Sequence, residues 1–224
     1  MADNTKEILT KCMEYLDNIN YISIQDFPNI DLYMDQVTTF MDDRMENSKR
    51  HPDDKILTKT MINNYAKNQL LPAPEKKKYS RDHLITLAFI YYFKNLLSIS
   101  DIQKLLNPLI EKHFKANDNF NFSDIYKEIY RLDQTELPML KEDIWNKFQH
   151  CSTSFLDVPE EERDYLQQFA LICELSFDVY YKKLLVEKMI DSLHLPDHEA
   201  SGPKKDGKRD DKKDLRKEDK KQNK

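Results

Sequence analysis

Glycine is nearly missing from this sequence. Its two glycines, Gly202 and Gly207, lie close to the end of the 224 residues. Tight hairpins and phosphate-binding loops use glycine, because it alone takes positive φ angles freely and lets another group approach the backbone. The shortage argues against a sheet-rich fold built on tight hairpins, and it argues against glycine-rich nucleotide loops. We predict an all-α fold whose helices are joined by Asn, Asp, Ser and Pro.

Long apolar runs and paired cysteines are also missing. No stretch of about 18 apolar residues occurs, so we expect no transmembrane helix. The first 17 residues are acidic and amphipathic, unlike a secretory signal. Cys12, Cys151 and Cys173 are odd in number and far apart, which suits a reducing compartment. We therefore expect a cytoplasmic protein.

The usual signatures of catalysis and metal binding are absent from the sequence. The histidines and cysteines show no CxxC or HxxxH spacing, and no nucleophile elbow, P-loop or dinucleotide fingerprint is present. His150 and Cys151 are adjacent, but sequence neighbours on a helix point apart, and no partner to orient a base is evident. We interpret this pair as partly buried surface residues, and we expect no enzyme, no cofactor and no metal.

Charge is distributed unevenly along the chain. The formal net charge is −5, yet residues 55–83 carry seven cations and two anions. Residues 1–54 and 84–196 are both acidic. One basic island on an acidic body concentrates affinity for a polyanion in that island.

The basic island contains a predicted helix with two unlike faces. Thr58 is a good N-cap, and Asn68 is expected to end the helix in a left-handed conformation before Pro72. The apolar face contains Met61, Ile62, Tyr65 and Ala66. The opposite face offers cations for phosphates and amides for base edges: Thr58, Lys59, Thr60, Asn63, Asn64 and Lys67.

A short basic segment follows this helix. Lys76, Lys77, Lys78, Tyr79 and Arg81 suit a hairpin or wing lying over a phosphate backbone, with Tyr79 as its anchor. Two supporting helices are then expected. The first is capped by Ser80, and the second by Ser98 or Ser100.

Residues 58–106 contain a spaced pattern in four parts: Thr58-x-x-Met61-Ile62-Asn63-Asn64-Tyr65, Leu70-Leu71-Pro72, Tyr79-Ser80-x-x-x-Leu84-x-x-Leu87-x-x-Ile90 and Ile102-x-x-Leu105-Leu106. This pattern resembles the MerR-type winged helix-turn-helix. That resemblance implies a second helix in the major groove, a wing on the backbone and a helix pair supporting both. Three segments carry a second resemblance: LYMDQVTTFM, LTKTMINNYAKNQLLP and KKKYSRDHL. Through them, roughly residues 25–190 are similar to the YkrK-type bacterial domain-of-unknown-function family. The implied role is transcriptional regulation.

The sequence departs from the MerR-type pattern at three places. Gln69 stands where the pattern has Gly, Lys76–Lys78 replaces Gly-Tyr-Arg, and Asn63 replaces an Arg of the recognition helix. A cation is still present in the wing to contact the phosphate backbone, and we assign that contact to Lys77. The link 47–55 is longer than the turn of a tight helix-turn-helix.

We divide the chain into four parts. Residues 1–30 are an N-terminal amphipathic helix and connector, and residues 31–108 are a MerR-like winged helix-turn-helix DNA-binding domain whose first helix spans 31–46. Residues 109–196 are a helical dimerisation or effector region, and residues 197–224 are a disordered Lys/Asp-rich tail.

The helical region is expected to contain a helix opening at Ser123, a break at Pro138, a short helix over 140–149 and a long helix from about 160 to 194. Apolar residues of the last helix fall on more than one face, so we expect a homodimer. Aromatic residues of this half either line an effector pocket or pack the core, and core packing is favoured.

Two functions from different classes follow. The first is a DNA-binding transcriptional regulator with a recognition helix at about 58–67, a wing at 76–81, and double-stranded DNA and a second copy as partners. The alternative is a non-enzymatic, all-helical protein-interaction module. The tail is interpreted as a solvated segment, with weak nucleic-acid contact as the second reading.

Overall fold

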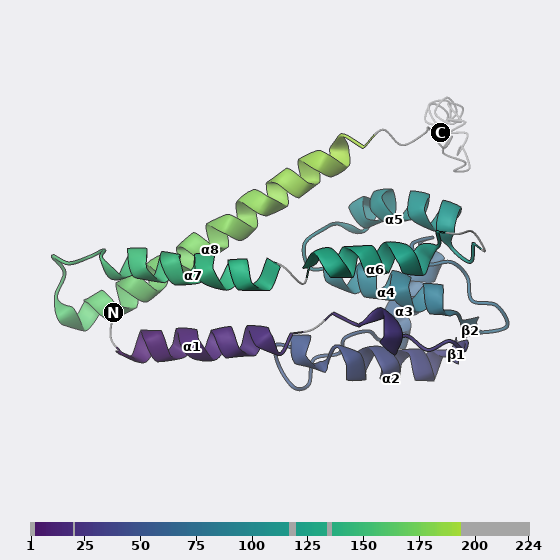
Figure 1. Cartoon of the computed structure of the whole chain (residues 1–224), viewed down its shortest axis with the longest axis horizontal. Helices are drawn as coiled ribbons and strands as arrows, with labels where there is room; N and C mark the ends of the chain where they lie inside the picture. Colours follow the sequence, from purple (N-terminus) through teal and green to yellow (C-terminus); the bar gives the residue numbers. More distant parts are fainter. Residues whose placement is uncertain (1–2, 20, 117–119, 134–135, 194–224) are drawn as a thin grey trace, which may run out of the picture. The chain divides into compact units, whose positions relative to one another are not determined.

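A computed structural model describes residues 3–19, 21–116, 120–133 and 136–193 (Figure 1). The described residues are mostly helical, as predicted. The helices are α1 (Asp3–Asp17), α2 (Met34–Arg44), α3 (Lys59–Lys67), α4 (Arg81–Phe93), α5 (Ile99–His113), α6 (Phe122–Asp133), α7 (Glu136–Ser152) and α8 (Glu160–Asp191). Short 3-10 turns η1 (Ile24–Asp26) and η2 (Glu46–Ser48) and strands β1 (Leu32–Tyr33) and β2 (Lys78–Tyr79) complete them. Among these helices none has the length and apolar content needed to cross a membrane. The expected tail lies outside the described residues.

A short strand replaces the first turn of the helix expected over 31–46. Leu32 pairs antiparallel with Tyr79, and α2 begins only at Met34. Tyr33 is extended, with φ −78° and ψ 159°, and its N–H donates to Oε1 of Gln36 at 2.9 Å. The strand forms because two side chains far apart in sequence, Leu32 and Tyr79, are both buried where the segments meet.

The expected caps of α3, α4 and α5 are confirmed, at Thr58, Ser80 and Ser98. Thr58 Oγ1 accepts from the Met61 N–H at 3.2 Å. Helix α3 ends where it was expected to end, with Asn68 as its C-cap, but the left-handed residue is Gln69 (φ 57°) and not Asn68 (φ −89°).

The prediction that Pro138 breaks the chain was wrong. Pro138 is the third residue of α7, which begins at Glu136. A proline costs little in the first turn, because the N–H that it lacks has no acceptor there within the helix.

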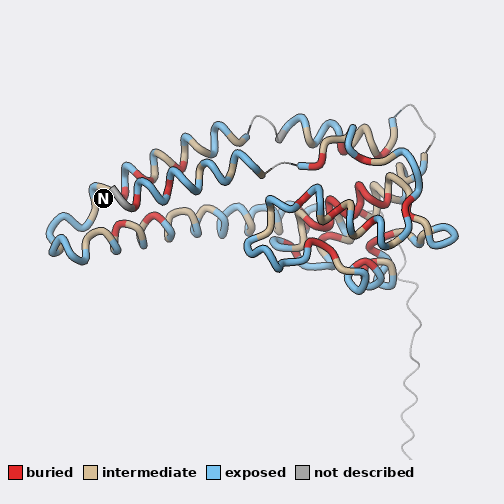
Figure 2. Tube along the Cα trace, turned by 90° about the horizontal axis from the view of Figure 1, so that it is seen from below, coloured by how far each residue is buried: buried red, intermediate tan, exposed pale blue. Residues whose placement is uncertain are grey.

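The main hydrophobic core is built around α4. Every residue from His83 to Tyr91 is buried, so α4 is covered on all sides (Figure 2). Helices α2, α3, α5 and α6 contribute Val37, Ile62, Ile102 and Phe122 to the same core. A helix that is apolar on all faces needs neighbours on every side. Helix α3 and strand β2 therefore belong to the same core as α4.

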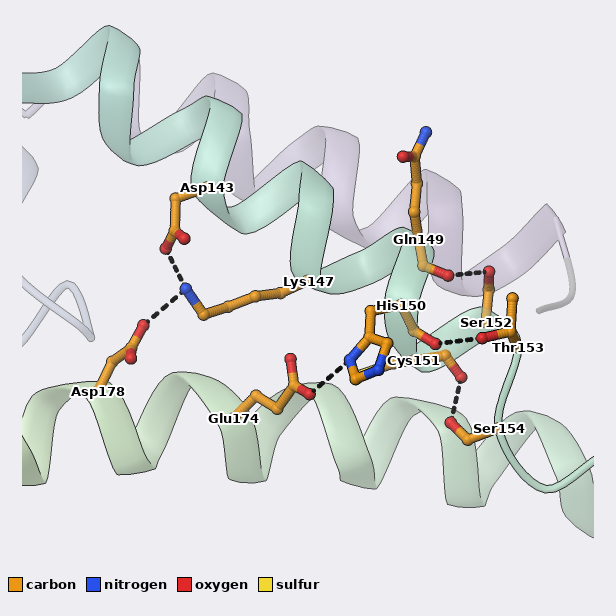
Figure 3. A network of polar contacts seen from close by, with 10 residues as sticks. All are labelled: Asp143, Lys147, Gln149, His150, Cys151, Ser152, Thr153, Ser154, Glu174 and Asp178. Atoms are coloured by element: carbon orange, nitrogen blue, oxygen red, sulfur yellow. Dashed lines mark hydrogen bonds and ion pairs between the residues drawn. The ribbon is translucent and has the colours of Figure 1, made fainter.

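A second, smaller core joins α1, α7 and α8. Leu9, Ile144, Phe148, Cys151 and Leu171 form its buried centre. Figure 3 shows the polar contacts along α7 and α8, where the Lys147 ammonium bridges the carboxylates of Asp143 and Asp178. The pair of Lys147 with Asp178 joins α7 to the middle of α8.

The pair His150 and Cys151 belongs to this α7–α8 packing. Cys151 is buried, whereas the exposed imidazole of His150 lies 3.0 Å from a carboxylate oxygen of Glu174 (Figure 3). Sequence reasoning found no partner for this histidine, since Glu174 lies 24 residues further along the chain. Burial raises the pKa of the Cys151 thiol and Glu174 adds to that shift, which is opposite to the activation of a nucleophile.

Candidate nucleic-acid interface

Helix α3 presents the predicted polar face to solvent. Ile62 and Tyr65 are buried in the main core, and the opposite side is exposed. The exposed side contains Lys59, Thr60, Asn63, Asn64 and Lys67. The polar face is therefore exposed as expected, with two neighbouring amides on it. On the predicted apolar face, Met61 is exposed, because only Ile62 and Tyr65 reach the core.

The hairpin after α3 turns within four residues. The Lys78 N–H donates to the Glu75 carbonyl at 2.8 Å, and the central residues Lys76 and Lys77 have φ angles of 49° and 65°. Positive φ at both central positions defines a type I′ turn, for which Asn-Gly is the usual sequence. The shortage of glycine argued against tight hairpins, yet here two lysines occupy such a turn.

The start of α2 connects α3 to this hairpin. Asp35, in the first turn of α2, forms an ion pair with Lys59 at the start of α3. Two residues earlier, the Tyr33 ring lies 5.3 Å from the ammonium of Lys78. Residues 33–35 therefore contact both the first turn of α3, the predicted recognition helix, and the basic hairpin.

Tyr79 is buried directly behind the hairpin. Its ring packs edge-on against His83, with 5.5 Å between the ring centroids, and burial raises the pKa of its hydroxyl. The structure thus places Tyr79 as the anchor expected from the sequence, and the side chain does not reach the exposed surface.

Arg81 is used inside the protein. Its guanidinium donates to the side-chain oxygen of Asn29 and to the carbonyl of Ile24, linking α4 to the segment before β1. Lys67, Lys76 and Lys77, by contrast, are exposed and form no ion pair with another described residue. Lys59 is exposed as well but pairs with Asp35, so these three are the predicted site lysines that are exposed and have no ion pair among the described residues.

Lys115 is a further cation beside the hairpin that sequence reasoning missed. Its ammonium lies 2.6 Å from the Glu75 carboxylate, a hydrogen bond that holds the pKa of Glu75 below its usual value. Its backbone N–H donates to Asp82 at 2.7 Å. Forty residues separate Glu75 and Lys115, so no local pattern indicates the pair.

His83 is a second residue that sequence reasoning missed. Its Nδ1 accepts from the Ser80 N–H at 2.9 Å, so it takes the place that Glu or Gln has in a capping box. Burial lowers the pKa of His83 to about 4, although the nearby Ala73 carbonyl opposes the shift. The Ser-x-x-His spacing was visible in the sequence and indicates this cap.

The long link between α2 and α3 is held by side chains. Ser48 Oγ lies 2.6 Å from the Tyr91 hydroxyl, and the Lys94 ammonium donates to the Ile56 carbonyl at 2.9 Å. Lys94 also lies 4.4 Å from the centre of the Tyr91 ring, and burial lowers its pKa. The link is therefore fixed on α4 even though it is longer than a tight turn.

A cavity of about 370 Å³ lies where η1, the end of α2 and α6 meet. Arg44 and Asp26, paired at 3.5 Å, are among its lining residues together with Tyr21 and Tyr130. Among the predicted aromatics, Phe122 and Tyr126 pack in the core as favoured. No group of three potential metal ligands occurs among the described residues.

Comparison with known proteins supports the coarser part of the family expectation. Residues 22–129, which include the candidate interface, match the family described as "Domain of unknown function (DUF1836)". This match supports a domain-of-unknown-function family and carries no statement about YkrK-type or MerR-like proteins. No curated protein and no solved structure matches the chain.

Proposed function

We propose that residues 31–108 form a winged helix-turn-helix that binds double-stranded DNA, and that the protein is a non-enzymatic transcriptional regulator. In this proposal α3 enters the major groove and the hairpin around Lys76–Lys77 lies on the phosphate backbone. The order α2, α3, hairpin, α4, α5 is compatible with the helix pair, wing and supporting helices that the MerR-type resemblance implies.

The type I′ turn is the observation that carries this proposal. A non-glycine residue in the left-handed region costs about 1–2 kcal/mol, and both central residues of the turn are lysines. A turn that only reversed the chain would be more stable with Asn and Gly. The turn keeps two strained lysines where both are exposed, and this supports a role for their charges. Phosphate groups are the ligand that suits such cations.

The face of α3 supports a role in base recognition. Asn63 and Asn64 are exposed amides, and an amide can donate to and accept from one adenine edge in the major groove. Lys59 is engaged with Asp35, but both partners are largely exposed, and such a pair costs little to separate. Arg81 has an internal role, so we assign it to support of the site.

A protein-interaction module is the second candidate, and the exposed apolar residues of α8 favour it. Salt dependence separates the two candidates. Each phosphate contact releases counterions, so the logarithm of DNA affinity falls with the logarithm of salt concentration, with a slope of about −0.9 per contact. Docking on a protein through apolar residues has no such slope.

Selection of bound fragments from a random duplex pool, at two salt concentrations, tests the proposal. Wild type is expected to enrich a shared motif, and Lys77→Glu is expected to weaken binding to all duplexes. Lys127→Glu on α6 is the matched control, since it makes the same charge change at an exposed site away from the hairpin. It should bind as wild type does.

Asn63→Ala is expected to bind duplex DNA with reduced preference among sequences, by about 1–3 kcal/mol at the affected base pair. Enrichment of nothing by wild type at low salt would overturn the DNA proposal. Equal losses from Lys77→Glu and Lys127→Glu would show that only overall charge matters, and that the hairpin is not a contact.

A further inference from the structure

Helix α8 exposes most of its apolar residues. Eleven large apolar side chains between Tyr165 and Met189 are exposed, and the buried residues of the helix are Gln167, Leu171 and Ile190. Figure 2 shows few buried positions along it. Core packing was the favoured reading for the aromatic residues of this half, and for Phe169, Phe177, Tyr180 and Tyr181 it was wrong. Apolar surface of this extent marks an interaction site.

Part of the exposed surface follows a seven-residue repeat. Alternating steps of four and three residues lead through Tyr165, Phe169, Ile172, Ser176, Val179, Lys183 and Val186. Its five apolar members are each at least 40% exposed. This spacing keeps side chains on one straight seam along a slightly supercoiled helix, and it is the spacing of a and d positions in coiled coils. We call these seven residues the α8 seam.

The seam lies away from the residues of α8 that pack on α7. It ends at Val186, because the next member of the repeat, Ile190, is buried in the main core. Glu174 and Asp178, with the buried Gln167 and Leu171, face α7. Of the other six exposed apolar residues, Tyr180 and Leu184 flank the seam. The remaining four, Phe177, Tyr181, Leu185 and Met189, follow steps of four. Such a row drifts by about 40° at each step, because 3.6 residues make a turn, so it does not form a straight seam along the helix.

We propose that a second copy of this chain packs its α8 against the seam, with the two helices antiparallel. A second copy presents the same seven-residue repeat, so knobs and holes match by symmetry. This inference goes beyond the proposed DNA binding and does not depend on it.

The size of the seam is sufficient for a dimer. Its five apolar side chains and the flanking Tyr180 and Leu184 present on the order of 600 Å² per copy, taking about half of each side chain as exposed. Two copies would therefore bury roughly 1,200 Å², the lower end of the range for specific interfaces. This area predicts a dimer that separates on dilution.

Charge determines the antiparallel orientation. Residues 160–174 carry five anions and one cation, whereas residues 175–191 carry three of each. Parallel helices would place the two acidic halves together and would bring Lys183 beside its own copy within the seam. Antiparallel helices place each acidic half beside a neutral one, which avoids both repulsions.

Molar mass measured by light scattering at micromolar protein, over a dilution series, is the first part of the test. Wild type is expected to have the mass of two chains, and Ile172→Glu the mass of one. Leu185→Glu is the matched control, because it puts the same charge on an equally exposed residue of α8 outside the seam. It is expected to remain dimeric.

Cross-linking tests the orientation. Phe169 and Val186 are 17 residues apart, about 25 Å along a helix, so a short cross-linker joins Phe169→Cys of one copy to Val186→Cys of the other only in antiparallel dimers. The test uses full-length chains with Cys12→Ser and Cys173→Ser, and it mixes the two variants.

A monomeric wild type at every concentration would overturn the dimer. Dissociation by Leu185→Glu but not by Ile172→Glu would overturn the seam as the interface. Cross-links that form only between identical variants would overturn the antiparallel orientation. None of these measurements contains DNA, so they fail or succeed separately from the proposed function.

Discussion

Replacing Lys76 and Lys77 with Asn and Gly tests both the strain and the purpose of the hairpin. Both lysines have φ angles in the left-handed region, which costs an ordinary residue about 1–2 kcal/mol. Glycine removes that cost at Lys77 but loses about 0.5–1 kcal/mol through the greater freedom of the unfolded chain. Asparagine recovers a smaller part at Lys76. The double variant is expected to be more stable by about 1 kcal/mol, or a melting temperature higher by about 2–4 °C.

The same variant should bind DNA less well. Removing two phosphate contacts lowers the slope of log affinity against log salt by about 1.8. The matched control replaces both lysines with Ala, which removes the same charges and leaves a side chain at positive φ. It should lose the same slope and gain no stability. A variant with Asn and Gly that is no more stable than the Ala control would refute the strain argument, and an unchanged slope would refute phosphate contact.

Two further substitutions test the support of the hairpin. Burial lowers the pKa of His83 to about 4 from an ordinary value near 6.5. Between these two pH values the unfolded chain binds more protons than the folded chain, so stability falls as pH falls. The loss is about 3 kcal/mol. Urea unfolding at pH 7, 5 and 4 should show a smaller loss for His83→Gln, and equal losses would contradict the assignment. Arg81→Ala removes hydrogen bonds to Asn29 and Ile24 and should cost about 1.5–3 kcal/mol of stability. Its salt slope for DNA should stay that of wild type, and a reduced slope would make Arg81 a direct contact.

Local chemistry explains the features that were predicted correctly. Thr58, Ser80 and Ser98 begin helices because their hydroxyls or backbone bonds satisfy first-turn N–H groups, which depends on near neighbours. The two faces of α3 follow from 3.6 residues per turn. The exposed polar face was therefore predictable, although its binding to DNA remains a proposal.

Contacts between distant segments explain what was missed. The strand pairing of Leu32 with Tyr79, the ion pair of Glu75 with Lys115 and the contact of His150 with Glu174 join residues that only folding brings together. The left-handed turn at Lys76–Lys77 was missed for a related reason. Local preference disfavours it, and the pairing of β1 with β2 behind it imposes it.

The sequence by itself determined the helical class, the starts of helices and the concentration of cations between residues 55 and 83, because each depends on composition or on spacing within one helix. Tertiary structure decided which of those cations have partners inside the protein. It buries Tyr79 and ties Arg81 to Asn29, and it leaves Lys67, Lys76 and Lys77 facing solvent. It also left the seam of α8 uncovered. Exposure depends on what else packs nearby, and only the folded arrangement contains that information.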